Sequence, residues 1–258
     1  MVDRLNRVVH VYPDPASAAR AAAERLVRLS DAAVERGRPF ALALSGGRTP
    51  EPLYRALGSW PDGARRWPSW QLFWCDERCV PQDDPRSNAG LARRLWLGPC
   101  RFPEENVHPV DTAVPMEEAA QRYERLLRTA LVGTGATFDA VVLGVGADGH
   151  TASLYPGAAA LRATGRWVVG EPSPSQPPDV PRVTLTLEGI GRARTAVFLV
   201  TGRDKRPALR RILLPPETGV DALRLPAAQV TALEGVEWFV DRDAAPPGVP
   251  VGEPPSGS

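Results

Sequence analysis

The chain has 258 residues, and at about 150 residues per domain this length suits one large α/β domain. Apolar residues make up 43% and charged residues 24%, so the chain can bury a real core and is not globally disordered. Lys and Arg number 31 against 30 Asp and Glu. This balance argues against a protein that binds nucleic acid by neutralising phosphates, although a local basic pocket remains compatible with it.

Cysteine usage and hydropathy indicate the compartment. Cys75, Cys79 and Cys100 are an odd number of cysteines in a long chain, which is not typical of a disulfide framework. No apolar run approaches the roughly 20 residues of a membrane span, and the N-terminal segment lacks the apolar stretch of a secretory signal. We therefore expect a cytoplasmic protein with no membrane partner.

Short β-branched apolar runs alternate with helical patterns, which is typical of βαβ units and a mostly parallel sheet. In chain order, strands are expected at 8–12, 40–44, 71–75, 138–143, 167–169, 183–187 and 196–200. Helices are expected from an Asp14-Pro15 start to Gly37, from Met116 to Gly133, and over 205–214. We assign 1–243 to a single domain, the proline-dense segment 171–181 to a surface loop, and 244–258 to a disordered tail.

The first candidate site is the loop 45–50, with the sequence SGGRTP, directly after an apolar strand. Its glycines allow a ligand to approach the backbone closely. Thr49 as N-cap and Pro50 as the first helical residue predict a helix N-terminus, whose free N–H groups attract anions. A plain tight turn is the alternative. The loop is not a Walker loop, because no Lys-Ser/Thr pair follows the glycines.

The second candidate is the loop 144–150, with the sequence GVGADGH. It matches the dinucleotide fingerprint formally, but only six residues separate Gly149 from Pro156, too few for the helix that this fingerprint opens. Asp148 and His150 are candidates for an orienting carboxylate and a general base. A packed or surface histidine is the alternative, and that is our interpretation of His10 and His108.

Two further segments place charge just past an apolar strand. In 201–205, Lys205 lies near an expected helix start, where a flexible point charge suits a phosphate; a solvated lysine is the alternative. In 76–78, two acids and an arginine would be costly unless they pair or face a site. Ligands of open parallel sheets bind outside the carboxyl ends of the strands, so we expect these loops to form one site.

Taken together, these segments resemble the 6-phosphogluconolactonase family. The similar segments are LSGGRTP, FWCDERCVP followed by Ser87 and Asn88, FDAVVLGVGADGHTASLYPG, and RVTLTLEGI with LVTGRDK, in the same order as in that family. The resemblance covers 40–214 and continues weakly through 225–230. It implies a three-layer α/β/α Rossmann-like fold without a cofactor. It also implies hydrolysis of 6-phospho-D-glucono-1,5-lactone to 6-phosphogluconate, the second step of the oxidative pentose phosphate pathway.

The chemistry implied by this resemblance needs a base, an anion anchor and a group that stabilises charge on the attacked carbonyl. We predict that neutral His150 takes a proton from the attacking water, because an unperturbed histidine pKa near ~6.5 leaves it available at neutral pH. Asp148 would orient either the imidazole or the water. Arg78, held by Asp76, would stabilise the developing oxyanion.

The substrate phosphate is expected on the glycine loop and on nearby cations. The predicted phosphate-binding residues are Ser45, Gly46, Gly47, Thr49 and Lys205, with Arg48, Arg182 and Arg194 as further candidates. Arg48 occupies a place where we would expect Ser or Thr, and Cys79 is likewise unusual for the motif. No metal is required. We expect a sugar-phosphate lactone as the partner, and a monomer.

Two other functions fit parts of the pattern. Glucosamine-6-phosphate deaminases are similar in the glycine loop, the Asp-Gly-His and the Gly-x-x-Lys, but they carry a catalytic glutamate after the histidine. Here the stretch 151–156 has no carboxylate, so deamination is the second choice. A non-catalytic sugar-phosphate sensor would normally carry a DNA-binding module. Residues 1–39 instead fit one strand and one helix.

Overall fold

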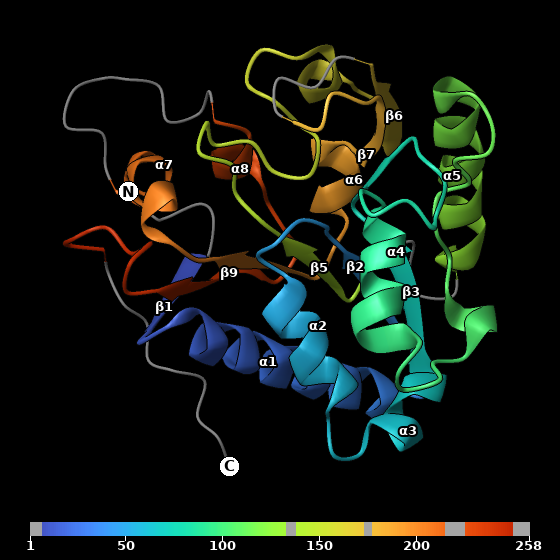
Figure 1. Cartoon of the computed structure of the whole chain (residues 1–258), viewed down its shortest axis with the longest axis horizontal. Coiled ribbons are helices and arrows are strands. Elements are labelled where there is room, and N and C mark those ends of the chain that lie inside the picture. Colours follow the sequence, from blue (N-terminus) through green and yellow to red (C-terminus); the bar gives the residue numbers. More distant parts are fainter. Residues whose placement is uncertain (1–6, 133–137, 173–176, 215–224, 250–258) are drawn as a thin grey trace.

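The computed structural model describes residues 7–132, 138–172, 177–214 and 225–249, arranged around a central parallel sheet (Figure 1). The sheet has six strands in the order β1-β9-β8-β5-β2-β3. Their bounds are β1 (Arg7–Tyr12), β2 (Phe40–Leu44), β3 (Trp70–Trp74), β5 (Ala140–Leu143), β8 (Thr195–Val200) and β9 (Gly235–Asp241). Every neighbouring pair is parallel, as the alternating pattern predicted.

A second, smaller sheet continues from the edge of the first. It is antiparallel, with the order β4-β7-β6, and comprises β4 (Asp76–Arg78), β6 (Val168–Glu171) and β7 (Arg182–Leu185). Only Cys75 separates β3 from β4, so the chain passes directly from the large sheet into the small one. The charged residues after Cys75 therefore lie on a strand rather than in a loop.

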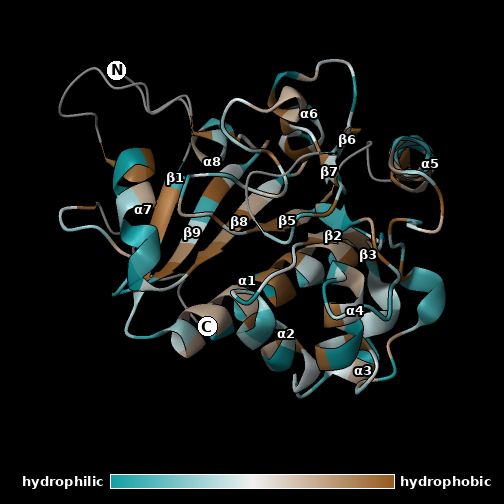
Figure 2. Cartoon of the chain, turned by 45° about the horizontal axis from the view of Figure 1, so that its top comes forward, coloured by the Kyte–Doolittle hydropathy of each residue, from teal (hydrophilic) through white to brown (hydrophobic). Residues whose placement is uncertain are grey.

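Helices cover both faces of the central sheet. They are α1 (Pro15–Glu35), α2 (Glu51–Gly58), α3 (Gly63–Arg66), α4 (Asn88–Ala92), α5 (Met116–Ala130), α6 (Leu187–Gly191), α7 (Arg206–Leu213) and α8 (Pro226–Gln229). The strands of the sheet are mostly apolar, whereas the helices carry mixed polar and apolar faces (Figure 2).

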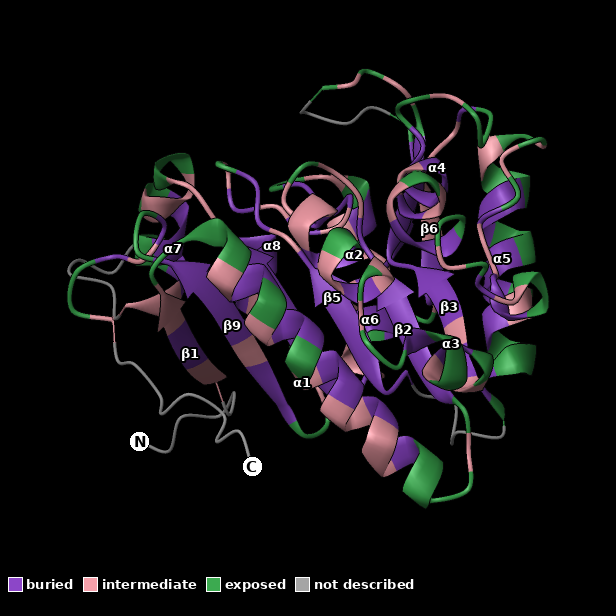
Figure 3. Ribbon diagram, turned by 60° about the horizontal axis from the view of Figure 1, so that its bottom comes forward, coloured by how far each residue is buried: buried purple, intermediate pink, exposed green. Residues whose placement is uncertain are grey.

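Strand β2 separates two apolar clusters, because successive side chains of a strand point to opposite faces. Ala41 and Ala43 join the cluster that also contains residues of α5, α7 and α8. Phe40, Leu42 and Leu44 join the cluster that contains residues of α1, α2 and α4. Along α1, buried and exposed positions alternate with the helical period (Figure 3). The three-layer α/β/α arrangement is confirmed.

Local sequence signals explain where the first helix begins and ends. The Asp14 side chain accepts a hydrogen bond of 2.8 Å from the Ser17 N–H, and Pro15 occupies the first turn, as predicted. Gly37 has a φ of +70°, a left-handed conformation that terminates the helix at low cost.

Several predicted elements differ from the structure. The strand expected at 183–187 ends at Leu185, because the Thr186 hydroxyl accepts a 3.0 Å bond from the Gly189 N–H and caps α6. Thr49 is not an N-cap: α2 begins at Glu51 with Pro50 in that position and no side-chain cap. Strand β9 was absent from the predicted elements.

The predicted boundaries of loops and tail also need correction. Glu171 still belongs to β6, while 173–176 lie outside the described residues. Gly133, expected to end the long helix, also lies outside them, and α5 ends at Ala130. Ala244 has no exposed surface, so the ordered chain continues past the boundary predicted at residue 243. Residues 250–258 lie outside the described part.

We expect Leu42→Ala to lower the free energy of unfolding by about 2–5 kcal/mol, because it leaves a cavity at a fully buried position of the central strand β2. Urea denaturation measures the change. Val34→Ala on α1, where the side chain is 48% exposed, is the control. It should change stability by no more than about 0.5 kcal/mol, and equal losses for the two variants would contradict the layer assignment.

Candidate active site

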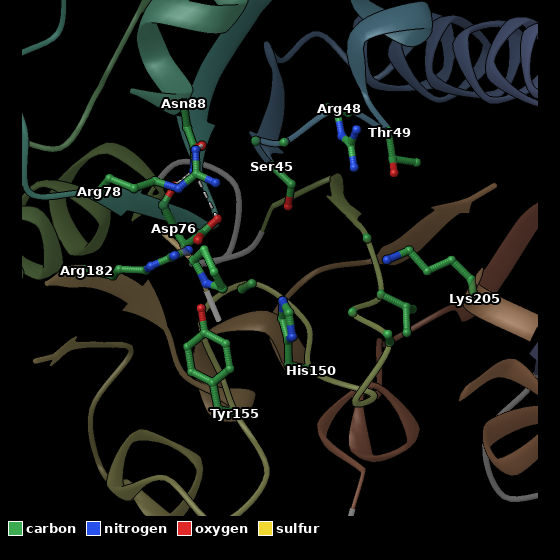
Figure 4. Close-up of a pocket in the computed structure, with 18 of the residues that line it drawn as sticks. Ser45, Arg48, Thr49, Asp76, Arg78, Asn88, His150, Tyr155, Arg182 and Lys205 are labelled. Carbon is green, nitrogen blue, oxygen red and sulfur yellow. Dashed lines mark hydrogen bonds between the residues drawn. The ribbon is translucent and has the colours of Figure 1, made fainter. Parts of the chain in front are cut away.

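A cavity of about 650 Å³ lies at the carboxyl ends of the central strands (Figure 4). Its walls come from the loops after β2, β5 and β8, from β4 and β7, and from the start of α4. The residues that line it are Ser45, Gly46, Gly47, Arg48, Thr49, Asp76, Arg78, Asn88, Gly144, Val145, Gly146, Ala147, His150, Ala152, Tyr155, Pro177, Arg182, Thr201, Asp204 and Lys205. The predicted convergence of the loops is therefore observed.

Positive charge dominates the lining of this cavity. Arg48, Arg78, Arg182 and Lys205 contribute cations, and only two of the lining residues, Asp76 and Asp204, are carboxylates. The side chains of Arg48 and Lys205 extend toward the cavity from one side, while those of Arg78 and Arg182 lie on the other (Figure 4). A cavity with this balance suits an anionic ligand.

Tight contacts fix the orientation of the His150 imidazole. Its Nδ1 lies 2.6 Å from Asp148 Oδ1, and its backbone N–H donates to the same oxygen at 3.1 Å. The Tyr155 ring packs beside it, with centroids 4.7 Å apart. A Cβ on Gly146 would overlap the imidazole, so only glycine leaves room for it. The sequence left open whether Asp148 orients the imidazole or the water. In the structure Asp148 contacts the imidazole.

The Asp148 contact also sets the protonation pattern of the imidazole. An ionised carboxylate only accepts hydrogen bonds, so Nδ1 carries the proton that is shared with Asp148. The other nitrogen, Nε2, then holds a lone pair and can accept a proton. His150 lines the cavity, so this geometry fits the general base that the sequence predicts.

Hydrogen bonds to strand β5 and helix α2 hold the start of the glycine loop in place. Ser45 Oγ donates a 2.7 Å bond to the Val142 carbonyl of β5, and the Tyr54 hydroxyl donates to the Ser45 carbonyl. Gly47 has a φ of +89°, which favours glycine. With Thr49 and the exposed Arg48, this loop forms the wall of the cavity nearest Lys205 (Figure 4).

Strand β4 contributes Asp76 and Arg78, but they do not pair directly as predicted. Among the described residues, Arg78 forms no ion pair with Asp76. Asn88 connects the two: its Oδ1 accepts from Arg78 Nη1, and its Nδ2 donates to the Asp76 carbonyl at 2.7 Å. Asp76 Oδ2 accepts a 2.6 Å bond from the Ser153 hydroxyl. The predicted link between Asp76 and Arg78 therefore runs through an amide.

A buried carboxylate, Glu77, holds the start of α4 beside the cavity. It accepts bonds of 2.7 Å from the Asn88 N–H and 2.8 Å from the Ala89 N–H. Burial raises the pKa of Glu77, while these backbone donors oppose the rise. The motif therefore divides its two acids between two tasks: Asp76 faces the cavity and Glu77 anchors a helix.

Two arginines lie directly opposite each other in the small sheet. Arg78 of β4 and Arg182 of β7 are cross-strand partners, and both line the cavity. Like charges directly opposite each other destabilise a sheet. Arg182 is almost fully buried, with 4% of its surface exposed. On the other side of β7, Arg182 is the cross-strand partner of the buried Glu171 of β6, so a carboxylate lies opposite this guanidinium as well.

The structure does not bring Arg194 to the cavity, so this candidate was wrong. Arg194 precedes β8 and therefore lies at the amino end of the sheet, opposite the site. There its Nη1 lies 3.2 Å from Glu234 Oε1 and its Nε 3.6 Å from Asp139 Oδ1. Lys205, at the carboxyl end of β8, does reach the cavity, and its Nζ lies 3.2 Å from Asp204 Oδ2.

The described residues form neither a cluster of metal ligands nor a membrane-spanning helix. In those ranges, no three His, Cys, Asp or Glu side chains come together as metal ligands would. None of the described helices combines the length and apolar character needed to cross a bilayer.

Comparison with known proteins identifies the family. The family model of glucosamine-6-phosphate isomerases/6-phosphogluconolactonase matches residues 13–238. The chain belongs to this family. A 6-phosphogluconolactonase of Synechocystis sp. is 40% identical over 221 residues, with 84% of this chain and 88% of that protein covered. The human 6-phosphogluconolactonase is 41% identical over 210 residues, with 80% of each chain covered.

The glucosamine-6-phosphate isomerase/6-phosphogluconolactonase family also supplies structural neighbours. The crystal structure of 6-phosphogluconolactonase from Thermotoga maritima has a TM-score of 0.77 and 32% identity to this chain. The likeness covers 92% of this chain and 100% of that one. The predicted fold class and family resemblance are both confirmed.

Some lining residues of this family member were not predicted. Asn88 was noted in a motif without a role, while Tyr155 and Asp204 were given none. Tyr155 follows His150 in a segment without regular helix or strand, so no periodicity directed its ring toward the imidazole. For Asn88, the sequence offered only its place beside Ser87 in the motif, because its helix start and its buried surroundings are known from the structure alone.

We expect Gly46→Ala to lower the free energy of unfolding by about 1–3 kcal/mol, because the added Cβ would overlap the Asn88 carboxamide. Gly144→Ala, at a position with nothing within 4 Å of the added Cβ, is the matched control and should have little effect. Thermal and urea denaturation compare the two variants. Equal stability of Gly46→Ala and the parent chain would contradict the close packing of Asn88 on the glycine loop.

Proposed function

We propose that the chain hydrolyses 6-phospho-D-glucono-1,5-lactone to 6-phospho-D-gluconate. The proposal rests on one observation: two different groups line the same cavity. One is the oriented His150 imidazole, and the other is a cationic wall formed by the glycine loop and Lys205. The first suits activation of water and the second suits a sugar phosphate. The family of the chain and the names of its relatives support the same reaction.

The phosphate would bind at the glycine-loop side of the cavity. It carries about −1.5 to −2 charges by analogy with phosphorylated side chains. Lys205 and Arg48 supply point charge, while Thr49 and the N–H groups of Gly46 and Gly47 supply donors. Ser45 donates its hydroxyl hydrogen to the Val142 carbonyl and so holds the loop in place. Binding the phosphate away from the carbonyl holds the ring so that water meets it in one geometry.

The hydrolytic step uses the remaining groups. His150 Nε2 takes a proton from water, and the oxygen of that water attacks the lactone carbonyl carbon. Asp148 stabilises the resulting imidazolium through Nδ1, and Arg78 stabilises the oxyanion. When the tetrahedral intermediate collapses, the bond to the ring oxygen breaks and the imidazolium returns the proton to that oxygen. The products are a carboxyl group and a free hydroxyl.

We also propose that the protein works as a monomer in the cytoplasm. Cys75, Cys79 and Cys100 are free thiols, which are typical of a reducing compartment.

The experiment that tests the function compares two substrates. Freshly made 6-phosphogluconolactone, corrected for spontaneous opening, should be hydrolysed, whereas glucosamine 6-phosphate should not be deaminated. His150→Asn should lower kcat by about 10²–10⁴-fold, because it removes the base. Binding of 6-phosphogluconate, followed by calorimetry, should persist in this variant. Near-normal turnover of His150→Asn would exclude His150 as the base.

We expect Lys205→Ala to raise KM by about 10–100-fold, because it removes a charge-assisted contact to the phosphate. Arg203→Ala is the matched control: it removes a neighbouring cation that is 80% exposed and does not line the cavity. Steady-state kinetics on the lactone measures both. If the two variants have the same KM as the parent chain, Lys205 does not bind the phosphate.

A further inference from the structure

Asn88 lies where the glycine loop meets strand β4. The residue is fully buried, with 0% of its surface exposed to solvent, yet it forms part of the wall of the cavity. Its side chain extends from α4 toward Arg78 and Asp76 (Figure 4). A buried carboxamide must satisfy its hydrogen bonds within the protein, so its orientation is set by its neighbours.

The two ends of the carboxamide bind groups of opposite kind. Oδ1 accepts from Arg78 Nη1, and Nδ2 donates to the Asp76 carbonyl at 2.7 Å and to Asp76 Oδ1 at 3.2 Å. Rotating the amide by half a turn would place its N–H₂ group against the Arg78 donors and its oxygen against the Asp76 acceptors. The carboxamide therefore has one favourable orientation and holds both charged residues in it.

The backbone of Asn88 is fixed as firmly as its side chain. Its N–H donates to Glu77 Oε1 at 2.7 Å, and the Ser87 hydroxyl caps the helix by accepting a 3.0 Å bond from the Gly90 N–H. Glu77 is 1% exposed, so the contacts that support the carboxamide are largely shielded from water.

The same carboxamide touches the phosphate side of the cavity. A Cβ on Gly46 would overlap its Oδ1, so the carboxamide packs directly against Gly46 of the glycine loop. On the other side it holds Arg78, whose Nη1 also donates to the Arg86 carbonyl at 2.7 Å. Asn88 is therefore in contact with the glycine loop and with the guanidinium at once.

We propose that Asn88 is a positioning residue for the lactone hydrolysis, acting by fixing the Arg78 guanidinium relative to the glycine loop. The inference rests on the proposed function. The phosphate and the attacked carbonyl belong to one sugar of limited span, so the spacing between their two binding walls decides whether both engage together. A misplacement of about 1 Å can cost on the order of 10²-fold in rate.

An amide suits this position better than its carboxylate isostere. A carboxylate would still accept from Arg78, but its second oxygen would face the two Asp76 oxygens, and like charges in one site repel. The titratable and charged groups around the carboxamide are Asp76, Glu77 and Arg78 on β4, with Arg48, His150 and Arg182 across the cavity. A protonated carboxyl would restore the donor that Asp76 needs.

The first test separates positioning from helix stability. Asn88→Ala should lower kcat for the lactone by about 10–100-fold with a smaller change in KM, because the phosphate wall is kept. Leu91→Ala is the matched control: it removes apolar packing from the same helix but leaves the Asn88 carboxamide and the Glu77 contacts in place. It should lower the Tm while kcat stays within about twofold. Equal losses of kcat in both variants would overturn the inference.

A double-mutant cycle tests whether Asn88 acts through Arg78. Arg78→Ala should lower kcat, and adding Asn88→Ala to it should cause little further loss, since the group being positioned is gone. Independent, multiplicative losses from the two substitutions would show that Asn88 does not act through the guanidinium and would overturn the proposal.

Asn88→Asp keeps the shape of the side chain and tests the inference even if Asn88→Ala does not fold. The ratio of its kcat to that of the parent chain should rise as pH falls from about 7.5 to about 5.5, as the introduced carboxyl gains a proton. A ratio near one at every pH would overturn the inference. Failure of the parent chain to hydrolyse the lactone would instead overturn the proposed function.

Discussion

The parallel alignment of β2, β5 and β8 is the constraint on which the site depends. Because the three strands run in the same direction in adjacent positions, their carboxyl ends meet at one edge of the sheet. The loops that follow them, 45–50, 144–150 and 201–205, are far apart in the sequence, yet all three border one cavity. Arg194 shows the same rule in reverse: it lies before β8 and is therefore directed to the opposite edge.

Buried polar groups at this edge are paired rather than isolated. Glu77 accepts backbone N–H groups at the start of α4, and Asp76 accepts from Ser153 and Asn88. Each contact offsets the cost of removing a carboxylate from water. These contacts also give each buried carboxylate a single favourable arrangement. The acceptors and donors that surround a ligand are then fixed before it binds, which is the condition for electrostatic stabilisation of a transition state.

The small antiparallel sheet supplies the two arginines on one side of the cavity. Through β4 and β7 it brings Arg78 and Arg182 to the cavity as cross-strand partners. The central sheet supplies the glycine loop, His150 and Lys205. The cavity is thus closed by two sheets whose strands follow each other directly at Cys75, with the glycine loop on one wall and the guanidinium groups of Arg78 and Arg182 on the other.

The sequence by itself determined the α/β class, most strand positions, the loops that carry the site and the Asp148–His150 pair. These follow from local features: apolar runs, glycine and proline placement, and the rule for the carboxyl ends of parallel strands. It did not determine the end of β7 at Leu185, where the Thr186 cap overrides an apolar run, nor strand β9. It assigned Glu77 no role, and it did not assign Asn88 the link to Arg78. Both roles depend on contacts between residues distant in the sequence: a carboxylate that accepts the N–H groups of a helix start, and an amide that lies between a guanidinium and a carboxylate. Only the tertiary structure decided them.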